Sequence, residues 1–380
     1  MKLVINCSTL SSTGPVQVAV SFIYECLRHN NHDYIIFLSP SVYRNIEIND
    51  FPANFTFYKF EHHPAFGIKG IITKKAMNKI VDKMTPDCVF SIFGPTTWKP
   101  NLPHLQGFAS GHYVYKDSPV YKIMSIKERF KRLILGKIQL YFLKRDGKYY
   151  VCESDDVSNR LSDILNINRR NVYTVTNSYS HYFIKKKFDK MVLPSYMSGT
   201  FKFLILSSAA QHKNLCILNE VIPILLDKYP SLKINFVVTI DDIKYKSLFN
   251  KHVQSYIYNI GSVSPSDCPQ LYYETDALFA PTLLECFSAN YPEAMIMERP
   301  IITTDLSFAH SICGDAALYF SPLDPYDAVD KINTLVNNSS LRSLLVKNGK
   351  KQLSKFDTSK SRADKYLKIC EDISTLENYE

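Results

Sequence analysis

Apolar strand-like runs that alternate with helical patterns constrain this chain more than any other feature. It opens with KLVINCST, a short apolar run that ends in small polar residues. Val16, Val20, Ile23 and Leu27 then recur at helical spacing, and the apolar run YIIFLS follows. Later runs, DCVFSIF, LPHLQGF, YYVCES and NVYTVTNS, read as further strands that end in small or polar residues. This order predicts a doubly wound α/β sheet, because strands buried on both faces are joined by crossover helices.

A second set of the same kind begins after residue 200. FKFLILSS leads into a helical pattern at NLCILNEVIPILLDKY, and the runs KINFVVTI, DALFAPT and PIITTD follow. The segment between the two sets is polar and irregular, which is typical of a linker. We therefore predict a first Rossmann-like domain at residues 1–182, a linker at 183–200 and a second Rossmann-like domain at 201–360. A chain of 380 residues is long enough for two such cores.

Composition excludes several classes of protein. A hydrophobic content of 46% argues against disorder, and a net charge of +9 is too small for a dedicated nucleic-acid binder. No uncharged apolar run approaches the roughly 18 residues of a membrane span. The nine cysteines form no C-x-x-C pair, and residues 1–20 lack a charged start followed by a long apolar core. We expect reduced thiols, no secretory signal and a cytoplasmic location.

The segment Lys122–Lys148 differs from its neighbours. It carries nine Lys or Arg residues against Glu128 and Asp146, with Ile, Leu, Phe and Tyr interleaved. Two interpretations have about equal weight. One is a solvated helix that covers the first sheet, and the other is a basic amphipathic helix on an anionic membrane surface. The second would place the protein peripherally on the inner face of the membrane.

The stretch DALFAPTLLECFSANYPEAMIMERPIITTD reads as one β–loop–α–β unit. Its loop falls at the carboxyl edge of a parallel strand, where such sheets bind ligands. A helix that starts near Ser288–Asn290 is favoured by Pro292 and by Glu293 in its first turn. The backbone N–H groups of Ser288, Ala289 and Asn290 would then point out of the helix start and form a phosphate site.

Two carboxylates bracket this loop. Glu285 would face the group beyond the phosphates, and Glu293 could accept hydrogen bonds from two neighbouring hydroxyls, such as those of a ribose. For an isolated pair of acids, a helix-dipole role for Glu293 and a surface role for Glu285 would be the better interpretation.

The wider pattern reverses that preference. The spacing E-x-F-x5-E, followed by Ala-Met, a closing Pro and a strand that ends at Asp305, resembles the signature of retaining glycosyltransferases of family 4 (glycosyl transferases group 1). Upstream, the run IGSVSPSDC resembles the family's nucleobase loop, and LSSAAQHKNL resembles its first phosphate loop, with Lys213 at the family's lysine. The resemblance implies the GT-B fold, in which two Rossmann-like domains face a central cleft. It also implies that the helix at 361–380 crosses back to the first, acceptor-binding domain.

The resemblance implies a donor-binding set in both domains. In the second domain it includes the nucleobase loop, the phosphate loop, the motif's phenylalanine, the helix start and both carboxylates: Gly261, Val263, Lys213, Phe287, Ser288, Ala289, Asn290, Glu285 and Glu293. In the first domain Gly14 stands where the family has a Gly-Gly loop, and His112 is the better candidate for the family's crevice histidine. The chain departs from the pattern at Ser208, where the family often has Arg, and at Cys286 and Ser288, where glycines are usual.

The expected activity is therefore retaining transfer of a sugar from a UDP- or GDP-type nucleotide sugar to a glycan or lipid-linked oligosaccharide. Bacterial surface polysaccharide synthesis (O-antigen or capsule) is the expected setting. Glu285, Lys213 and His112 are the expected catalytic residues. The chain has no Asp-x-Asp motif, so we expect catalysis without metal or cofactor. Two alternatives stay open: a GT-B-fold nucleotide-sugar epimerase, and a non-catalytic nucleotide-sugar-binding subunit.

Overall fold

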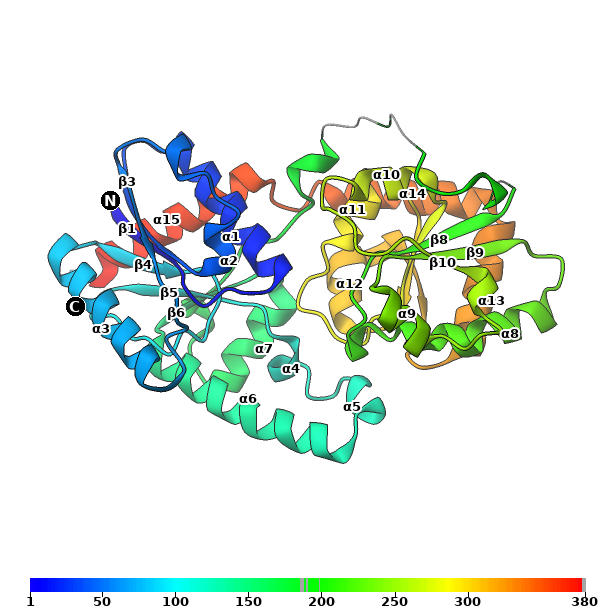
Figure 1. The fold of residues 1–380 in the computed structure, drawn as a ribbon, viewed down its shortest axis with the longest axis horizontal. Helices are drawn as coiled ribbons and strands as arrows, with labels where there is room; N and C mark the ends of the chain where they lie inside the picture. Colours follow the sequence, from blue (N-terminus) through cyan, green and yellow to red (C-terminus); the bar gives the residue numbers. More distant parts are fainter. Residues whose placement is uncertain (185–187, 189–190, 198, 378–380) are drawn as a thin grey trace. The chain divides into compact units, whose positions relative to one another are not determined.

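The chain folds into two compact units, each built on one parallel sheet (Figure 1). The computed structural model describes residues 1–184, 188, 191–197 and 199–377. Unit 1 contains Met1–Val114, Phe130–Asn177 and Asp357–Glu380, and unit 2 contains Tyr115–Arg129 and Ser178–Phe356. The expected linker at 183–200 lies partly outside the described residues.

Unit 1 has a seven-stranded parallel sheet in the order β3-β2-β1-β4-β5-β6-β7. Five of the strands coincide with apolar runs that the sequence analysis assigns to strands. β7 lies within a sixth run, NVYTVTNS, whereas no such run predicts β3. The strands are β1 (Lys2–Cys7), β2 (Asp33–Leu38), β3 (Phe55–Lys59), β4 (Cys88–Ser91), β5 (His104–Phe108), β6 (Tyr149–Cys152) and β7 (Val172–Thr174). The strand order reverses between β1 and β4, which pair in parallel from Leu3↔Cys88 to Asn6↔Ser91.

Helices cover both faces of the unit 1 sheet. The helices are α1 (Thr13–Glu25), α2 (Pro40–Tyr43), α3 (Gly67–Met84), α4 (Gly111–Val114), α6 (Ile126–Asp146, which begins in unit 2), α7 (Asp155–Leu165) and α15 (Ser359–Glu377). One apolar core joins β1 to α1 and α15, through residues such as Phe22 and Tyr366. A second core lies under α3, through Met77 and Val81. Right-handed crossovers place α3, α6 and α7 on the face opposite to α1.

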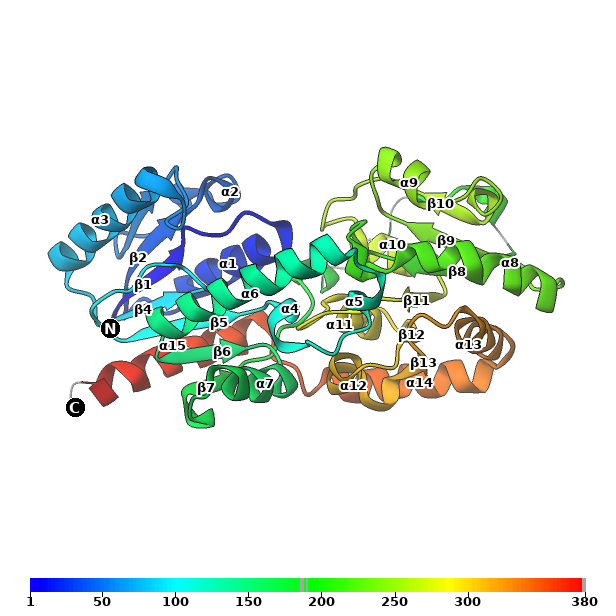
Figure 2. The ribbon, with the colours of Figure 1, turned by 90° about the horizontal axis from the view of Figure 1, so that it is seen from below.

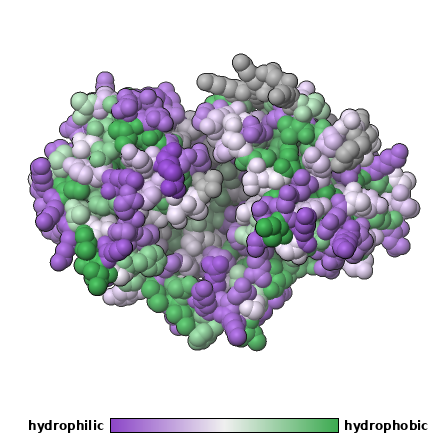
Figure 3. Space-filling model, in the orientation of Figure 1, coloured by the Kyte–Doolittle hydropathy of each residue, from purple (hydrophilic) through white to green (hydrophobic). Residues whose placement is uncertain are grey.

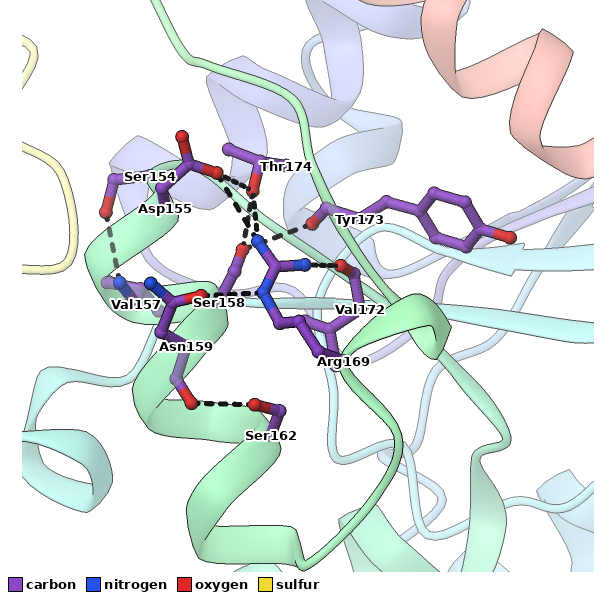
Figure 4. A network of polar contacts seen from close by, with 10 residues as sticks. All are labelled: Ser154, Asp155, Val157, Ser158, Asn159, Ser162, Arg169, Val172, Tyr173 and Thr174. Carbon is purple, nitrogen blue, oxygen red and sulfur yellow. Dashed lines mark hydrogen bonds and ion pairs between the residues drawn. The ribbon is translucent and has the colours of Figure 1, made fainter.

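The edge strand β7 is tied to α7 by one arginine (Figure 4). The guanidinium of Arg169 donates to Asn159 Oδ1 at 2.7 Å and to the backbone oxygen of Val172. Thr174 Oγ1 donates to Asp155 Oδ1 at 2.6 Å. These contacts join both ends of β7 to the adjacent helix, so the strand has polar partners in addition to its ladder with β6.

Unit 2 has a six-stranded parallel sheet in the order β10-β9-β8-β11-β12-β13. The strands are β8 (Phe201–Ile205), β9 (Ile234–Val238), β10 (Ile257–Asn259), β11 (Ala277–Ala280), β12 (Ile301–Thr304) and β13 (Ala317–Phe320). The helices are α5 (Val120–Ile123), α8 (Leu218–Lys228), α9 (Asp242–Leu248), α10 (Cys268–Glu274), α11 (Asn290–Ile296), α12 (Ser307–Cys313), α13 (Pro325–Asn337) and α14 (Ser339–Leu353). Phe203, Phe236 and Phe279 form the centre of its core. The strand order reverses between β8 and β11.

Residues 115–129 pack in unit 2, although they lie within the range 1–182 that the sequence pattern assigns to the first domain. Ser118 Oγ donates to the backbone oxygen of Leu283 at 2.7 Å. Gln211 Nε2 donates to the backbone oxygen of Ile123 at 3.0 Å. This segment lies between two stretches of unit 1 in the sequence, but it packs against unit 2.

The predicted doubly wound α/β class is confirmed by the two parallel sheets. Among the described residues, no helix combines the length and the apolar character that crossing a bilayer requires.

Candidate functional site

A pocket lies at the carboxyl ends of β8 and β11, the two neighbouring strands of unit 2 where the strand order reverses. Ligands of open α/β sheets bind at such a switch point, because the loops after the two strands run in opposite directions and leave a crevice. The pocket is lined by Ile205, Leu206, Ser207, Lys213, Leu215, Phe279, Ala280, Pro281, Thr282, Glu285, Ser288 and Asn290. Four residues predicted for the donor site, Lys213, Glu285, Ser288 and Asn290, therefore line one pocket.

Lys213 and Glu285 form an ion pair in this pocket, between Nζ and Oε1. Lys213 ends a short 3-10 turn (Gln211–Lys213) after β8, and Glu285 lies in the loop after β11. Their side chains are only 19% and 13% exposed, so the pair is shielded from bulk water. Thr282 Oγ1 lies 3.4 Å from the same carboxylate oxygen. A partly desolvated cation in this position can interact strongly with an anionic ligand.

The loop that carries Glu285 is fixed by hydrogen bonds to both flanking strands. Asn290 Nδ2 donates to the backbone oxygen of Leu206 at 2.5 Å. On the other side, Thr304 Oγ1 donates to the backbone oxygen of Thr282 at 2.6 Å. The backbone N–H of Leu283 donates to the backbone oxygen of His212 at 2.7 Å, which links this loop to the turn that carries Lys213. The position of the ion pair is thus preorganised by the backbone.

Helix α11 begins at Asn290, with Ala289 as its N-cap residue. The predicted start near Ser288–Asn290 agrees with this. The first N–H groups of a helix have no carbonyl partner within the helix and carry partial positive charge. Because Ser288 and Asn290 also line the pocket, the helix start and Lys213 bring positive potential to the same place.

Glu293 lies on α11 beside a buried tyrosine. Tyr272 Oη donates to Glu293 Oε2 at 3.1 Å and lies 3.2 Å from the backbone oxygen of Asn290. Burial of the carboxyl group raises the pKa of Glu293 to about 8, although the hydrogen bond from Tyr272 acts in the opposite direction. The same burial raises the pKa of Tyr272 well above its ordinary value, so its hydroxyl stays a donor. The raised pKa favours the protonated form of Glu293 near neutral pH.

Phe287, Gly261 and Val263 do not line the pocket. The Phe287 ring packs edge-on against Phe356, with centroids 5.8 Å apart. Gly261 and Val263 lie in the loop after β10, two strands away from β8. Gly261 has φ +79°, a backbone conformation that favours glycine.

Gly14 and His112 lie in unit 1. Gly14 is the second residue of α1, and a Cβ added there would meet nothing within 4 Å. His112 lies on the short helix α4. Both residues lie on helices that follow strands of the first sheet, whereas the sequence pattern indicates loops at these positions. Their roles stay predictions.

Three residues that shape the site are absent from the set predicted from sequence. Thr282 contacts Glu285, Tyr272 contacts Glu293, and Ser118 holds the backbone of the loop at Leu283. Only Thr282 lies within the motif stretch. Its hydroxyl directly follows the end of a predicted strand, so it could have been recognised as a site residue from the sequence. Over the part of the chain that the structure describes, no group of three or more His, Cys, Asp or Glu residues is arranged to hold a metal ion.

Known glycosyltransferases resemble the part of the chain that forms this pocket. Residues 200–338 match the family described as glycosyl transferases group 1, and all the residues that line the pocket fall within this range. An uncharacterized glycosyltransferase of Methanocaldococcus jannaschii is 25% identical over 236 residues, which is 60% of this chain and 61% of that protein. The chain thus aligns with about three fifths of the length of this curated relative.

Solved structures show the same fold along nearly the whole chain. A glycosyltransferase from Rickettsia africae has a TM-score of 0.72 at 16% identity, with 98% of each chain covered. Anabaena HepE in complex with UDP and glucose has a TM-score of 0.71 at 11% identity, covering 97% of this chain and 99% of that one. WaaG, a glycosyltransferase involved in lipopolysaccharide biosynthesis, has a TM-score of 0.70 at 13% identity, covering 97% and 99%. These likenesses confirm the predicted GT-B fold.

Proposed function

We propose that this chain is a retaining glycosyltransferase that moves a sugar from a UDP- or GDP-type nucleotide sugar to a glycan or a lipid-linked oligosaccharide. The observation that carries the proposal is the shielded Lys213–Glu285 pair, which lies beside the start of α11 at the switch point of unit 2. The group 1 domain at 200–338 and the UDP and glucose bound by the Anabaena protein support it.

Lys213 and the helix start would stabilise the leaving nucleoside diphosphate. Negative charge grows on the diphosphate as its bond to the sugar breaks, and preorganised donors lower the barrier where that charge develops. Lys213 Nζ has three N–H donors, so it can keep its contact with Glu285 and still donate to a phosphate oxygen. The N–H groups at the start of α11 would hold the same diphosphate.

Glu285 would orient both the lysine and the donor sugar. Its contacts with Lys213 and Thr282 both use Oε1, so Oε2 is the oxygen that would accept from a sugar hydroxyl. In this role Glu285 forms no covalent intermediate. The acceptor would attack from the face that the diphosphate leaves, which retains the anomeric configuration. Analysis of the product anomer by nuclear magnetic resonance tests this stereochemistry.

Glu293 would bind the ribose hydroxyls, and the loop at Gly261 and Val263 would contact the base. A carboxylate can accept two hydrogen bonds from neighbouring hydroxyls, whereas a protonated carboxyl group must donate one of its own. Binding of the ribose is therefore coupled to loss of the Glu293 proton. In unit 1 we assign Gly14 to backbone contact with the diphosphate and His112 to the reacting groups.

Donor affinity is expected to increase with pH because of this coupling. The pKa of Glu293 in the unliganded protein is about 8, so the ionised form that accepts from ribose grows as pH rises from 7 to 9. The apparent KM for the donor should fall over this range in initial-rate measurements. Glu293→Gln should raise KM, leave kcat nearly unchanged and remove the pH dependence, since a ribose contact is made equally in ground and transition states. A pH-independent KM in the wild-type protein would contradict this role.

Incubation with radiolabelled nucleotide sugars, with and without added glycan or lipid-linked acceptors, tests the proposed function. Label that moves to an acceptor supports transfer. Interconversion of two nucleotide sugars without an acceptor would indicate an epimerase instead. The protein could also bind a nucleotide sugar but catalyse neither reaction with any of the UDP- and GDP-sugars and acceptors tested. That result would favour the non-catalytic subunit. A preceding thermal-shift screen of nucleotide sugars identifies the donor to be labelled.

Transfer is expected to survive chelation by EDTA. The chain has no Asp-x-Asp motif, and Lys213 with the start of α11 offers a cationic alternative for the leaving diphosphate. Initial rates with and without EDTA should be equal. Complete loss of activity that manganese or magnesium restores would show that a metal site is required.

The setting we propose is bacterial surface polysaccharide synthesis, at the cytoplasmic side of the membrane. WaaG, which shares the fold, is a glycosyltransferase of lipopolysaccharide biosynthesis, and this supports an acceptor of the same general class. A panel of O-antigen and capsule intermediates in the labelled assay would identify the acceptor.

A further inference from the structure

Helix α6 exposes an apolar stripe on the side opposite to its packed side. Ile126, Phe130, Ile134 and Ile138 recur every four residues, and their exposed fractions are 83%, 63%, 44% and 46%. Tyr141 extends the stripe and is 63% exposed. The buried residues Gly136 and Leu143 lie on the opposite side of the helix, which packs against unit 1. This observation excludes the arrangement in which the apolar side chains of α6 pack on the sheet and only charges remain outside.

The first turns of α3 expose a second apolar group. Phe66, Ile68, Ile71 and Ile72 are 71%, 78%, 50% and 60% exposed. The opposite side of α3, which includes Met77 and Val81, is buried against the sheet. The Phe66 ring lies 4.9 Å from that of His63, but all four side chains remain largely open to solvent. A contiguous set of exposed apolar side chains usually marks an interaction surface.

The two helices lie on the same face of unit 1. The right-handed crossovers β3–α3–β4 and β5–α6–β6 run in the same direction along the sheet, which places both helices on one side. In Figure 1 both run along the lower side of unit 1, and in Figure 2 both face the viewer. Hydrophobic side chains gather at the same lower side in the space-filling view of Figure 3.

The two segments that contain α3 and α6 carry most of the excess positive charge of the chain. The segment Lys122–Lys148 has nine Lys or Arg residues against two acids, and α3 has five lysines against Asp82. Together these two segments exceed the net charge of +9 of the whole chain, so the remainder of the protein is slightly acidic. Lys131 and Lys137 on α6, and Lys75 and Lys79 on α3, are exposed beside the apolar side chains.

We propose that α3 and α6 together form a docking surface for an anionic lipid bilayer, which we name the α3–α6 surface. Its apolar part, all within unit 1, is Phe66, Ile68, Ile71, Ile72, Phe130, Ile134, Ile138 and Tyr141. Isoleucine and phenylalanine side chains enter the boundary of the acyl chains, while the lysines remain at the level of the anionic headgroups. The surface does not depend on the proposed transferase activity, but it would bring the acceptor-binding unit to a lipid-linked substrate.

Charge favours a lipid surface over a second copy of this chain. A symmetric dimer through this face would bring two strongly basic surfaces together, and like charges in contact oppose association. An anionic bilayer offers opposite charge and an apolar interior within one ligand. The combination of exposed isoleucines with interleaved lysines fits both features.

Co-sedimentation of the full chain with vesicles of phosphatidylglycerol and phosphatidylcholine tests the charges. The protein should pellet with these vesicles at low salt and much less with pure phosphatidylcholine. Replacing Lys75, Lys79, Lys131 and Lys137 by Gln should weaken binding by at least a hundredfold, since each basic residue near such a surface contributes roughly fivefold. Replacing Lys347 and Lys351, exposed lysines on α14 of unit 2, should leave binding unchanged.

Apolar insertion is tested separately in each helix. Phe130→Ser/Ile134→Ser/Ile138→Ser and Ile68→Ser/Ile72→Ser should each reduce pelleting at least tenfold. Ile243→Ser/Leu344→Ser, at exposed apolar sites of unit 2, is the matched control and should bind normally. Circular dichroism melting verifies that each variant is folded. Normal pelleting of both apolar variants would overturn the proposal, and so would a wild-type dimer that these substitutions dissociate without any loss of vesicle binding.

Discussion

Glu285→Ala is expected to lower the turnover of sugar transfer by about a hundredfold or more, and Lys213→Ala by a similar factor. The two side chains form one shielded ion pair at the pocket, and Thr282 contacts the same carboxylate oxygen. Removing either partner leaves the other charge partly buried without its counter-ion and removes a group that acts on the developing charge. The measurement is kcat at a saturating concentration of nucleotide sugar.

The double variant separates a shared role from two independent ones. Because the pair acts as a unit, Lys213→Ala/Glu285→Ala should lose little more activity than either single variant. Glu285→Gln keeps the hydrogen-bonding shape but not the charge, so its rate should lie between those of Glu285→Ala and the wild type. If the fold-loss of kcat in the double variant equals the product of the two single fold-losses, the residues act separately.

A surface ion pair of the same unit supplies the matched control. Lys350 Nζ lies 2.9 Å from Glu298 Oε1, but these side chains are 56% and 53% exposed and do not line the pocket. Exposed pairs contribute little to stability, so Lys350→Ala should retain normal turnover. Wild-type turnover in Glu285→Ala, with a melting temperature equal to that of Lys350→Ala, would remove the catalytic role of the motif.

The pocket at the ends of β8 and β11 was largely predictable from the sequence, because its residues follow strands. Lys213 comes after β8 and Glu285 after β11, and the carboxyl ends of parallel strands meet at one edge of a sheet. Strand periodicity and the spacing of the motif therefore suffice to bring these two charges together. The start of α11 follows from the same local pattern, since Pro292 and Glu293 are typical of a first helical turn.

Tertiary contacts of the site were not predictable in the same way. Tyr272 belongs to α10, and nothing in its sequence neighbourhood shows that its hydroxyl reaches Glu293. The raised pKa of Glu293 depends on burial by surrounding elements, which one sequence does not report. The contact of Ser118 with Leu283 joins residues 165 positions apart and depends on how residues 115–129 leave unit 1.

The direction of α6 illustrates the same limit. Its spacing predicts a helix with interleaved apolar and basic residues, but not which side meets the sheet. The structure shows Gly136 on the packed side, where an added Cβ would lie 3.3 Å from Tyr113 Cδ1. A residue without a side chain thus permits close approach of the helix, and the isoleucine stripe is left on the outside.

Gly107→Ala is expected to destabilise the folded protein severely. Gly107 lies in β5, and a Cβ added there would be 1.8 Å from the backbone oxygen of Ile92 and 2.8 Å from its carbonyl carbon. Neither atom belongs to a flexible side chain. The backbone N–H of Gly94 also donates to the backbone oxygen of Gly107 at 2.7 Å, so separating the two segments would break this contact.

The substitution should therefore lower the free energy of unfolding by about 4 kcal/mol or more, a large part of the roughly 5–15 kcal/mol typical of a folded domain. Denaturant unfolding followed by circular dichroism measures the change, and loss of soluble protein on expression is the extreme form of the same result. Gly14→Ala is the matched control, because its Cβ would meet nothing within 4 Å and its backbone is helical. That variant should change stability by less than about 1 kcal/mol. If Gly107→Ala unfolds at the same denaturant concentration as Gly14→Ala, the close approach of β5 to Ile92 is not a feature of the folded protein.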